Sequence, residues 1–249
     1  MLKDILTSPN ESRPLIATII GSGGIGKTTF ASTFPKPVIM RVEDGVMVLK
    51  GREDVAMLPI INNSKDVFNQ IEMLATEEHN FETLIIDSIT QLNVLLESEV
   101  LSSDPKAKSI NSALGGYGAG HSAVGEIHRK IRDWCGMLSV EKNMNIIFIG
   151  HMDTETIELP ESDMFMRYTL RMNKKSISHY SDNVDVVGHL KLKTFTRGGS
   201  DDKVAKAISD GTRVLTTYAT ANSISKNRLG ISEDITIEKG FNPFLQFIK

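Results

Sequence analysis

Short apolar runs alternate along the chain with stretches whose apolar residues recur every three or four positions. The runs at 14–20, 83–87 and 145–150 are almost continuously apolar, which is typical of strands buried on both faces of a sheet. The run at 37–45 begins in the same way and ends in two acids and a glycine. These runs predict the parallel strands of an α/β protein.

The intervals between these runs carry helical periodicity. After residue 122, apolar side chains are spaced by three and four positions as far as Leu138, which predicts one long helix behind a glycine-rich loop at 115–122. Ser64 is a candidate N-cap for a second helix. We predict helices over 27–34, 65–78, 88–101 and from 123 onward.

The last third of the chain is richer in strand patterns than in helical ones. The segments 186–195, 213–219 and 234–238 read as strands, and we expect them to extend the sheet in antiparallel fashion. No Pro/Ser-rich linker divides the sequence. We therefore expect one domain over 1–249, with a short N-terminal arm at 1–13 and a C-terminal tail at 240–249.

Composition narrows the class of protein. The chain has 249 residues, 40% hydrophobic residues and a net charge of −3, so nucleic-acid binding would need a local basic patch. The single cysteine, Cys135, excludes a disulfide framework. We find no membrane span and no secretory signal, and we expect a soluble protein of the cytoplasm.

The segment Gly21–Thr28 carries the strongest chemical signal. It follows a predicted strand, opens a predicted helix and fits G-x-x-x-x-G-K-[ST], the pattern of a phosphate-binding P-loop. The glycines expose backbone N–H groups to phosphate, Lys27 can reach the outer phosphates, and Thr28 can offer its hydroxyl to Mg²⁺. The predicted nucleotide-binding residues are Ser22, Gly23, Gly24, Ile25, Gly26, Lys27, Thr28 and Thr29.

Two acids can complete such a site. Asp87 ends the apolar run at 83–87, where a carboxylate can hold Mg²⁺ together with Thr28; it could also cap the helix that follows. Glu43 comes at the end of the run at 37–45 and is the candidate base that orients a water molecule toward the γ-phosphate. Asp44 competes for that role.

The segments "VEDG", "LIIDSITQL" and "GYGAGHSAVGEIHRKIRDWCGMLSVEKNMNIIFIGHMD" resemble the ATPase core of RecA/RadA-type recombinases. The compact length and the stretch "TRVLTTYATANSISKNRLGI" are similar to the short RecA-like ATPases of bacteriophages, including the Sak-type single-strand annealing proteins. The resemblance covers about 14–232. It implies a RecA-like P-loop fold, ATP and Mg²⁺ as cofactors, single-stranded DNA as partner, assembly into a homo-oligomer, and contact with a single-strand-binding protein.

The resemblance also assigns roles by position. His151 corresponds to the sensor of the γ-phosphate, although recombinases carry glutamine or asparagine there, and the first strand begins too early for their longer N-terminal segment. The two DNA-binding loops correspond to 115–121 and roughly 152–176. The candidate DNA contacts are Tyr117, His121, Arg167, Tyr168, Arg171, Lys174 and Lys175.

Two questions stay open at the level of sequence, the role of one segment and the class of protein. Basic and aromatic residues interleave in "MFMRYTLRM", which suits binding of single-stranded nucleic acid, but an ordinary half-buried strand shows the same alternation. As for the class, a partition ATPase of the ParA/MinD type has a similar P-loop, and a small-molecule kinase is a further alternative.

Lys226 and Arg228 are two apart in "SKNRLG". This spacing directs both side chains the same way along an extended segment. Their position after the second predicted loop resembles that of the basic residues with which subunits of RecA-like oligomers contact a neighbour's ATP. We therefore expect Lys226 and Arg228 to complete the catalytic set of Glu43, Lys27 and His151.

Overall fold

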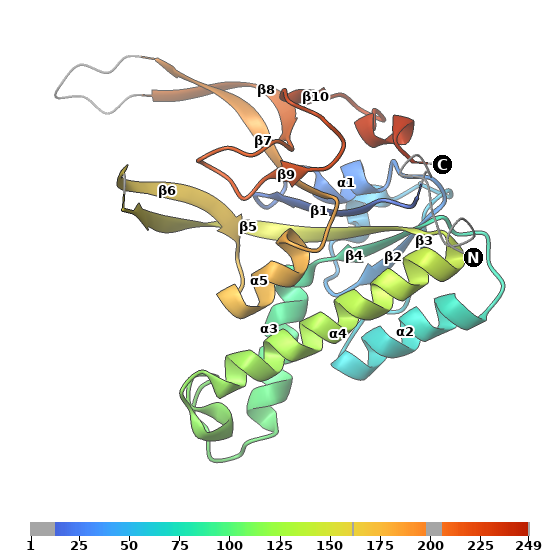
Figure 1. The fold of residues 1–249 in the computed structure, drawn as a ribbon. Helices are drawn as coiled ribbons and strands as arrows, with labels where there is room; N and C mark the ends of the chain where they lie inside the picture. The colour runs from blue at the N-terminus through green and yellow to red at the C-terminus, as the bar shows by residue number, and fades with distance from the viewer. Residues whose placement is uncertain (1–12, 161, 198–205, 249) are drawn as a thin grey trace, which may run out of the picture.

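The computed structural model describes residues 13–160, 162–197 and 206–248, and Figure 1 shows their fold. Its strands are β1 (Ile16–Gly21), β2 (Pro37–Arg41), β3 (Ala56–Met57), β4 (Thr83–Asp87), β5 (Asn145–Leu159), β6 (Ser162–Leu170), β7 (Val186–Arg197), β8 (Lys206–Thr216), β9 (Lys226–Asn227) and β10 (Ile235–Ile237). Its helices are α1 (Lys27–Ala31), α2 (Ser64–Thr76), α3 (Ile89–Ser102), α4 (Ala119–Lys142) and α5 (Lys174–Ser181), with short 3₁₀ turns η2 (Val46–Leu49), η3 (Ala113–Gly115) and η4 (Pro243–Gln246).

The strands form one mixed sheet with the order β10-β8-β7-β1-β5-β4-β2-β3. Strands β3, β2, β4, β5, β1 and β7 are mutually parallel. Strands β8 and β10 continue the sheet antiparallel at one edge, while β6 pairs with β5 and β9 with β7. This arrangement confirms the predicted α/β class and the antiparallel extension by the C-terminal third.

Helices cover both faces of the parallel strands, which explains why these strands are apolar throughout. Alternate residues of β1 point to opposite layers: Ile16 and Ile20 pack with the layer of α2, α3, α4 and α5, whereas Ala17 and Ile19 pack with α1. Figure 1 shows α2, α4 and α5 on one side of the sheet and α1 with the C-terminal turn on the other.

The C-terminal segment, predicted as a tail, packs into the layer of α1. Phe244 in η4 is fully buried, and its ring centroid lies 6.1 Å from those of Phe30 and Phe34. Residues 240–248 thus contribute to the core on the side of α1. The predicted N-terminal arm at 1–13 lies outside the described residues except for its last residue.

Several predicted helix boundaries were wrong; α4, for example, begins at Ala119 and not at residue 123. Helix α1 ends at Ala31 instead of continuing to residue 34. Helix α2 is capped by Asn63, whose side chain accepts from the backbone N–H of Asp66 at 3.0 Å. Ser64 is already the first residue of the helix and so is not its cap. Its hydroxyl donates to Glu99 on α3 at 2.8 Å.

The region predicted as a second loop is ordered as a β-hairpin. Strand β5 continues well past residue 150 and pairs with β6 from Met152↔Leu170 to Leu159↔Ser162, and α5 follows. We call residues 152–160 and 162–170 the β5–β6 arm, and the outer parts of β7 and β8 (189–197 and 206–214) the β7–β8 arm. Both arms extend from the end of the sheet at which β1 ends (Figure 1).

Candidate nucleotide site

The predicted phosphate-binding residues gather where the parallel strands end. Gly21 ends β1 and lies level with His151 on β5. Asp87 ends β4, and Glu43 follows β2 by two residues. The topology thus brings together four segments that are far apart in sequence. Ligands of open α/β sheets bind at these carboxyl ends of the strands.

The turn after β1 adopts a backbone that needs glycine. Gly24 and Gly26 have φ angles of 73° and 102°, which side chains rarely tolerate. A Cβ on Gly21 would lie 2.5 Å from the carbonyl oxygen of Leu190. The glycines of the motif therefore allow the tight backbone turn that a phosphate-binding loop requires.

Lys27 is buried beneath this turn. Its ammonium group donates to the carbonyls of Gly21 at 3.0 Å and Ser22 at 2.8 Å. Burial lowers the pKa of Lys27, while the nearby carboxylates of Asp87 and Glu43 act in the opposite direction and favour its charged form. The side chain is thus a cation held next to the loop.

Thr28 and Asp87 meet at the other wall of the site. The Thr28 hydroxyl donates to Oδ2 of Asp87 at 2.6 Å, and burial raises the pKa of Asp87 above its usual value. These oxygens fit Mg²⁺, which keeps several waters and takes further ligands from phosphate. The described residues contain no cluster of three or more His, Cys, Asp or Glu side chains that could hold a metal by themselves.

Glu43 and Lys27 lie on either side of His151. The imidazole Nε2 lies 3.5 Å from Glu43 Oε1, and Nδ1 lies 3.5 Å from Lys27 Nζ. The hydrogen bond with His151 is the main reason that the pKa of Glu43 is lowered, although burial opposes it. The backbone N–H of His151 donates to Thr90 Oγ1 at 2.8 Å and holds this part of β5 against α3.

These side chains surround one cavity of about 330 Å³. Its lining consists of Gly24, Gly26, Lys27, Thr28, Thr29, Glu43, Gly45, Val48, Asp87 and His151. Asp44, the competing acid, is exposed and is not part of this lining. The peptide bond between Asp87 and Ser88 is cis, and the Ser88 side chain, not Asp87, caps α3.

A second hollow, of about 250 Å³, adjoins Gly26 and Thr29 on the side of α1. Arg213 of β8 and Phe241 of the C-terminal segment also line it. The guanidinium Nε of Arg213 donates to the carbonyl of Ile25 at 2.7 Å. No motif marks Arg213 or Phe241, so sequence reasoning missed both; only the pairing of β8 with β7 brings Arg213 to the P-loop.

The two residues predicted for the first DNA-binding loop differ in exposure and in local structure. Tyr117 is fully exposed and has a φ of 51°. His121 instead lies in the first turn of α4, with Nε2 2.8 Å from Asn111 Oδ1. Helix α4 begins at Ala119, so the predicted glycine-rich loop at 115–122 is partly helical.

Several cations predicted for the second loop are paired within the chain. Arg167 lies 2.8 Å and Lys174 3.5 Å from Glu155, while Lys175 donates to the Gly118 carbonyl at 3.1 Å. The Arg171 guanidinium donates to the carbonyl of Met152 at 3.4 Å. Tyr168, on the opposite face of β6 from Arg167, packs its ring against His189.

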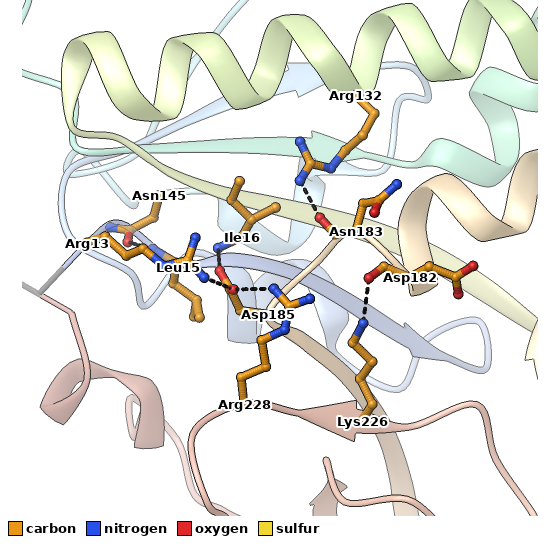
Figure 2. A network of polar contacts seen from close by, with 10 residues as sticks. All are labelled: Arg13, Leu15, Ile16, Arg132, Asn145, Asp182, Asn183, Asp185, Lys226 and Arg228. Atoms are coloured by element: carbon orange, nitrogen blue, oxygen red, sulfur yellow. Dashed lines mark hydrogen bonds and ion pairs between the residues drawn. The ribbon is translucent and has the colours of Figure 1, made fainter. Parts of the chain in front are cut away.

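Arg228 lies beside the start of β1, where its backbone N–H donates to the carbonyl of Asp185, and Lys226 is level with Thr18 in the middle of β1; Figure 2 shows both side chains. Lys226 Nζ donates to the carbonyl of Asp182 at 2.7 Å, and Arg228 Nη1 lies 3.3 Å from Oδ1 of the buried Asp185. Arg13 pairs with the same carboxylate. Figure 2 shows both side chains directed toward residues 182–185, and Arg228 forms its ion pair within its own chain.

Fold and site together define a nucleotide-binding protein of the P-loop class with the residues of an ATPase. The family model described as "AAA domain" matches residues 13–229, and the chain belongs to this family. No curated protein matches it. Over the part of the chain that the structure describes, none of the helices has the length and apolar character needed to cross a bilayer.

Proposed function

We propose that this chain is a RecA-like ATPase that acts on single-stranded DNA in annealing or homologous recombination of a bacteriophage, in the cytoplasm of the host. The observation that carries the ATPase part of the proposal is the row Glu43–His151–Lys27 across a cavity that also contains Thr28 and Asp87, and the DNA part rests on the resemblance to RecA-like recombinases. This row supplies a base, a polar sensor and a cation in one place, as hydrolysis of a γ-phosphate requires.

Each residue has a defined part in this proposal. The backbone of Gly24 and Gly26 binds the phosphates, and Lys27 exchanges its carbonyl partners for phosphate oxygens. Thr28 and Asp87 would hold Mg²⁺, which would neutralise charge on the phosphates. Glu43 orients a water molecule and takes its proton. Because His151 touches both Lys27 and Glu43, it couples the state of the phosphate to the base.

The remaining cation comes from a second subunit in this proposal. Arg228 lies beside the start of β1 and the P-loop follows its end, about 16 Å away for a strand of this length. Within one chain Arg228 therefore cannot reach the phosphate. A head-to-tail contact would bring Arg228, with Lys226 near it, from one subunit onto the P-loop end of the next, and such contacts generate rings or filaments.

Single-stranded DNA is the partner that tests this function, with a single-strand-binding protein as a further partner. ATP turnover should rise when single-stranded DNA is added, measured as phosphate release at fixed ATP and Mg²⁺. A partition ATPase of the ParA/MinD type or a small-molecule kinase does not predict this response to single strands. Unchanged turnover with saturating single-stranded DNA would contradict the DNA part of the proposal.

A further inference from the structure

A large hollow of about 690 Å³ separates the two β-arms; we call it the arm groove. Met152 and Tyr168 of the β5–β6 arm line one wall. The opposite wall belongs to the β7–β8 arm, and the outer surface of the P-loop, 22–25, also lines the groove. The groove therefore adjoins the nucleotide cavity on the far side of the loop.

The wall of the β7–β8 arm is cationic. Lys191, Lys193 and Arg213 all line the groove, and Arg213, which pairs with Leu192, reaches it from the face of the arm opposite to the two lysines. Among the described residues, Asp234 is the one acid in the lining. Lys191 lies 3.9 Å from that acid. Lys193 is exposed, and its ammonium group lies 5.5 Å from the ring centroid of Phe195. Two of the three cations thus have no acidic partner in the groove lining.

The groove also contains a partly exposed aromatic ring. The Tyr168 ring lies 4.9 Å from that of His189, at an interplanar angle of 55°, and Tyr168 keeps 37% of its surface exposed. His189 is buried, its Nε2 has no hydrogen-bond partner among the described residues, and burial lowers the pKa of its imidazole to about 4. A neutral ring therefore supports Tyr168 from behind.

We propose that the arm groove binds a single strand of nucleic acid, with phosphates at Lys191, Lys193 and Arg213 and a base stacked on Tyr168. Lys191 and Lys193 are about 7 Å apart along an extended strand, so they present a row of charge and not one point. Cations in a row beside an exposed ring are the elements that hold single strands. This inference rests on the proposed function in one respect: both take single-stranded nucleic acid as the ligand.

The position of the groove links the strand to the nucleotide. A bound strand would touch Ser22 and Gly23 directly, and Arg213, through its bond to Ile25, would connect phosphates in the groove to the P-loop backbone. Two ligands that meet at one loop affect each other's affinity reciprocally. ATP and the strand should therefore change one another's binding by the same factor.

Fluorescence anisotropy of a labelled twelve-nucleotide thymidine oligomer tests the groove. Lys193→Ala should weaken binding by about two- to fivefold and reduce the slope of log affinity against log salt by about 0.7, the value for one phosphate contact on a single strand. Lys65→Ala is the control, because Lys65 is exposed on α2 and its removal changes the net charge equally. It should leave affinity and slope unchanged.

Tyr168 tests the stacking contact separately. Tyr168→Ala should weaken binding on the order of tenfold, whereas Tyr168→Phe keeps the ring and should bind as the unaltered protein does. Circular dichroism verifies that each variant is folded. A loss in Tyr168→Ala that phenylalanine fails to restore would argue against a stacked base.

The outcomes separate the groove from the proposed function. If the unaltered protein binds the oligomer and neither Lys193→Ala nor Tyr168→Ala changes affinity or slope, the groove is wrong and strand binding lies elsewhere. If the unaltered protein does not bind the oligomer, both the groove and the DNA part of the function fail. If ATP displaces the oligomer from a Lys27→Ala protein, the groove takes a mononucleotide and the proposal is overturned.

Discussion

Replacing Glu43 by glutamine removes the proposed base and keeps the size of the side chain. The amide oxygen can still accept from His151, whose Nε2 lies 3.5 Å from Glu43 Oε1. We therefore expect ATP to bind with its usual affinity. Loss of a general base costs a factor of 10²–10⁴ in rate, so turnover should fall by at least about 10²-fold, equivalent to about 2.7 kcal/mol of barrier.

The effect on stability should be much smaller than the effect on rate. The Glu43 side chain is 36% exposed and its contact with His151 is long, and exposed ion pairs contribute at most about 1 kcal/mol. A thermal melt of Glu43→Gln should thus remain close to that of the unaltered protein. This comparison distinguishes a lost base from a damaged fold.

The assay is single-turnover phosphate release, with ATP affinity measured in parallel by calorimetry. Because the pKa of Glu43 is lowered from 4.5, the carboxylate is ionised above that value, so protonation of Glu43 should reduce the rate only when the pH falls below it. Asp44→Asn is the matched control, since Asp44 is the exposed neighbour. Normal turnover in Glu43→Gln together with a large loss in Asp44→Asn would refute the assignment.

Further predictions concern the metal and the subunit contact. Asp87→Asn should keep a partner for the Thr28 hydroxyl but remove the charge, so the gain in ATP affinity on adding Mg²⁺ should shrink; an unchanged Mg²⁺ dependence by calorimetry would exclude Asp87 as a ligand. Arg228→Ala should leave the fold and ATP binding intact, since Arg13 still pairs with Asp185. It should lose turnover, because the cation proposed to reach a neighbour's ATP is removed. Mixing it with Lys27→Ala subunits should restore part of the activity, and mixtures that co-assemble without any gain would rule out a contact in trans.

The parallel core and the phosphate site could be predicted because their signals are local. A strand buried on both faces is continuously apolar, and the P-loop needs glycine at Gly24 and Gly26 for their positive φ angles. Asp87 could be placed because it ends an apolar run, and strand ends share one edge of a parallel sheet. Glu43 followed from the same reasoning; His151 was placed by the resemblance to RecA-type ATPases.

The β-arms and their contacts depend on pairing between distant segments, which leaves little trace in sequence. The alternation in β6 fitted both a loop and a strand, and only its pairing with β5 decided between them. Arg213 reaches the P-loop through the register of β8 on β7, and Phe244 enters the core through a turn with no periodicity. Ser64 and Asn63 are both good caps, so residue type could not choose between them.

Binding of ATP to Lys27→Ala tests the central claim most directly. Lys27 is buried beneath the P-loop and is the side-chain cation among the described residues that lines the 330 Å³ cavity, so its removal should abolish measurable ATP binding in calorimetry. Lys65→Ala, an exposed control on α2, should bind ATP normally. A folded Lys27→Ala protein with unchanged affinity for ATP would contradict the assignment of this cavity as the nucleotide site.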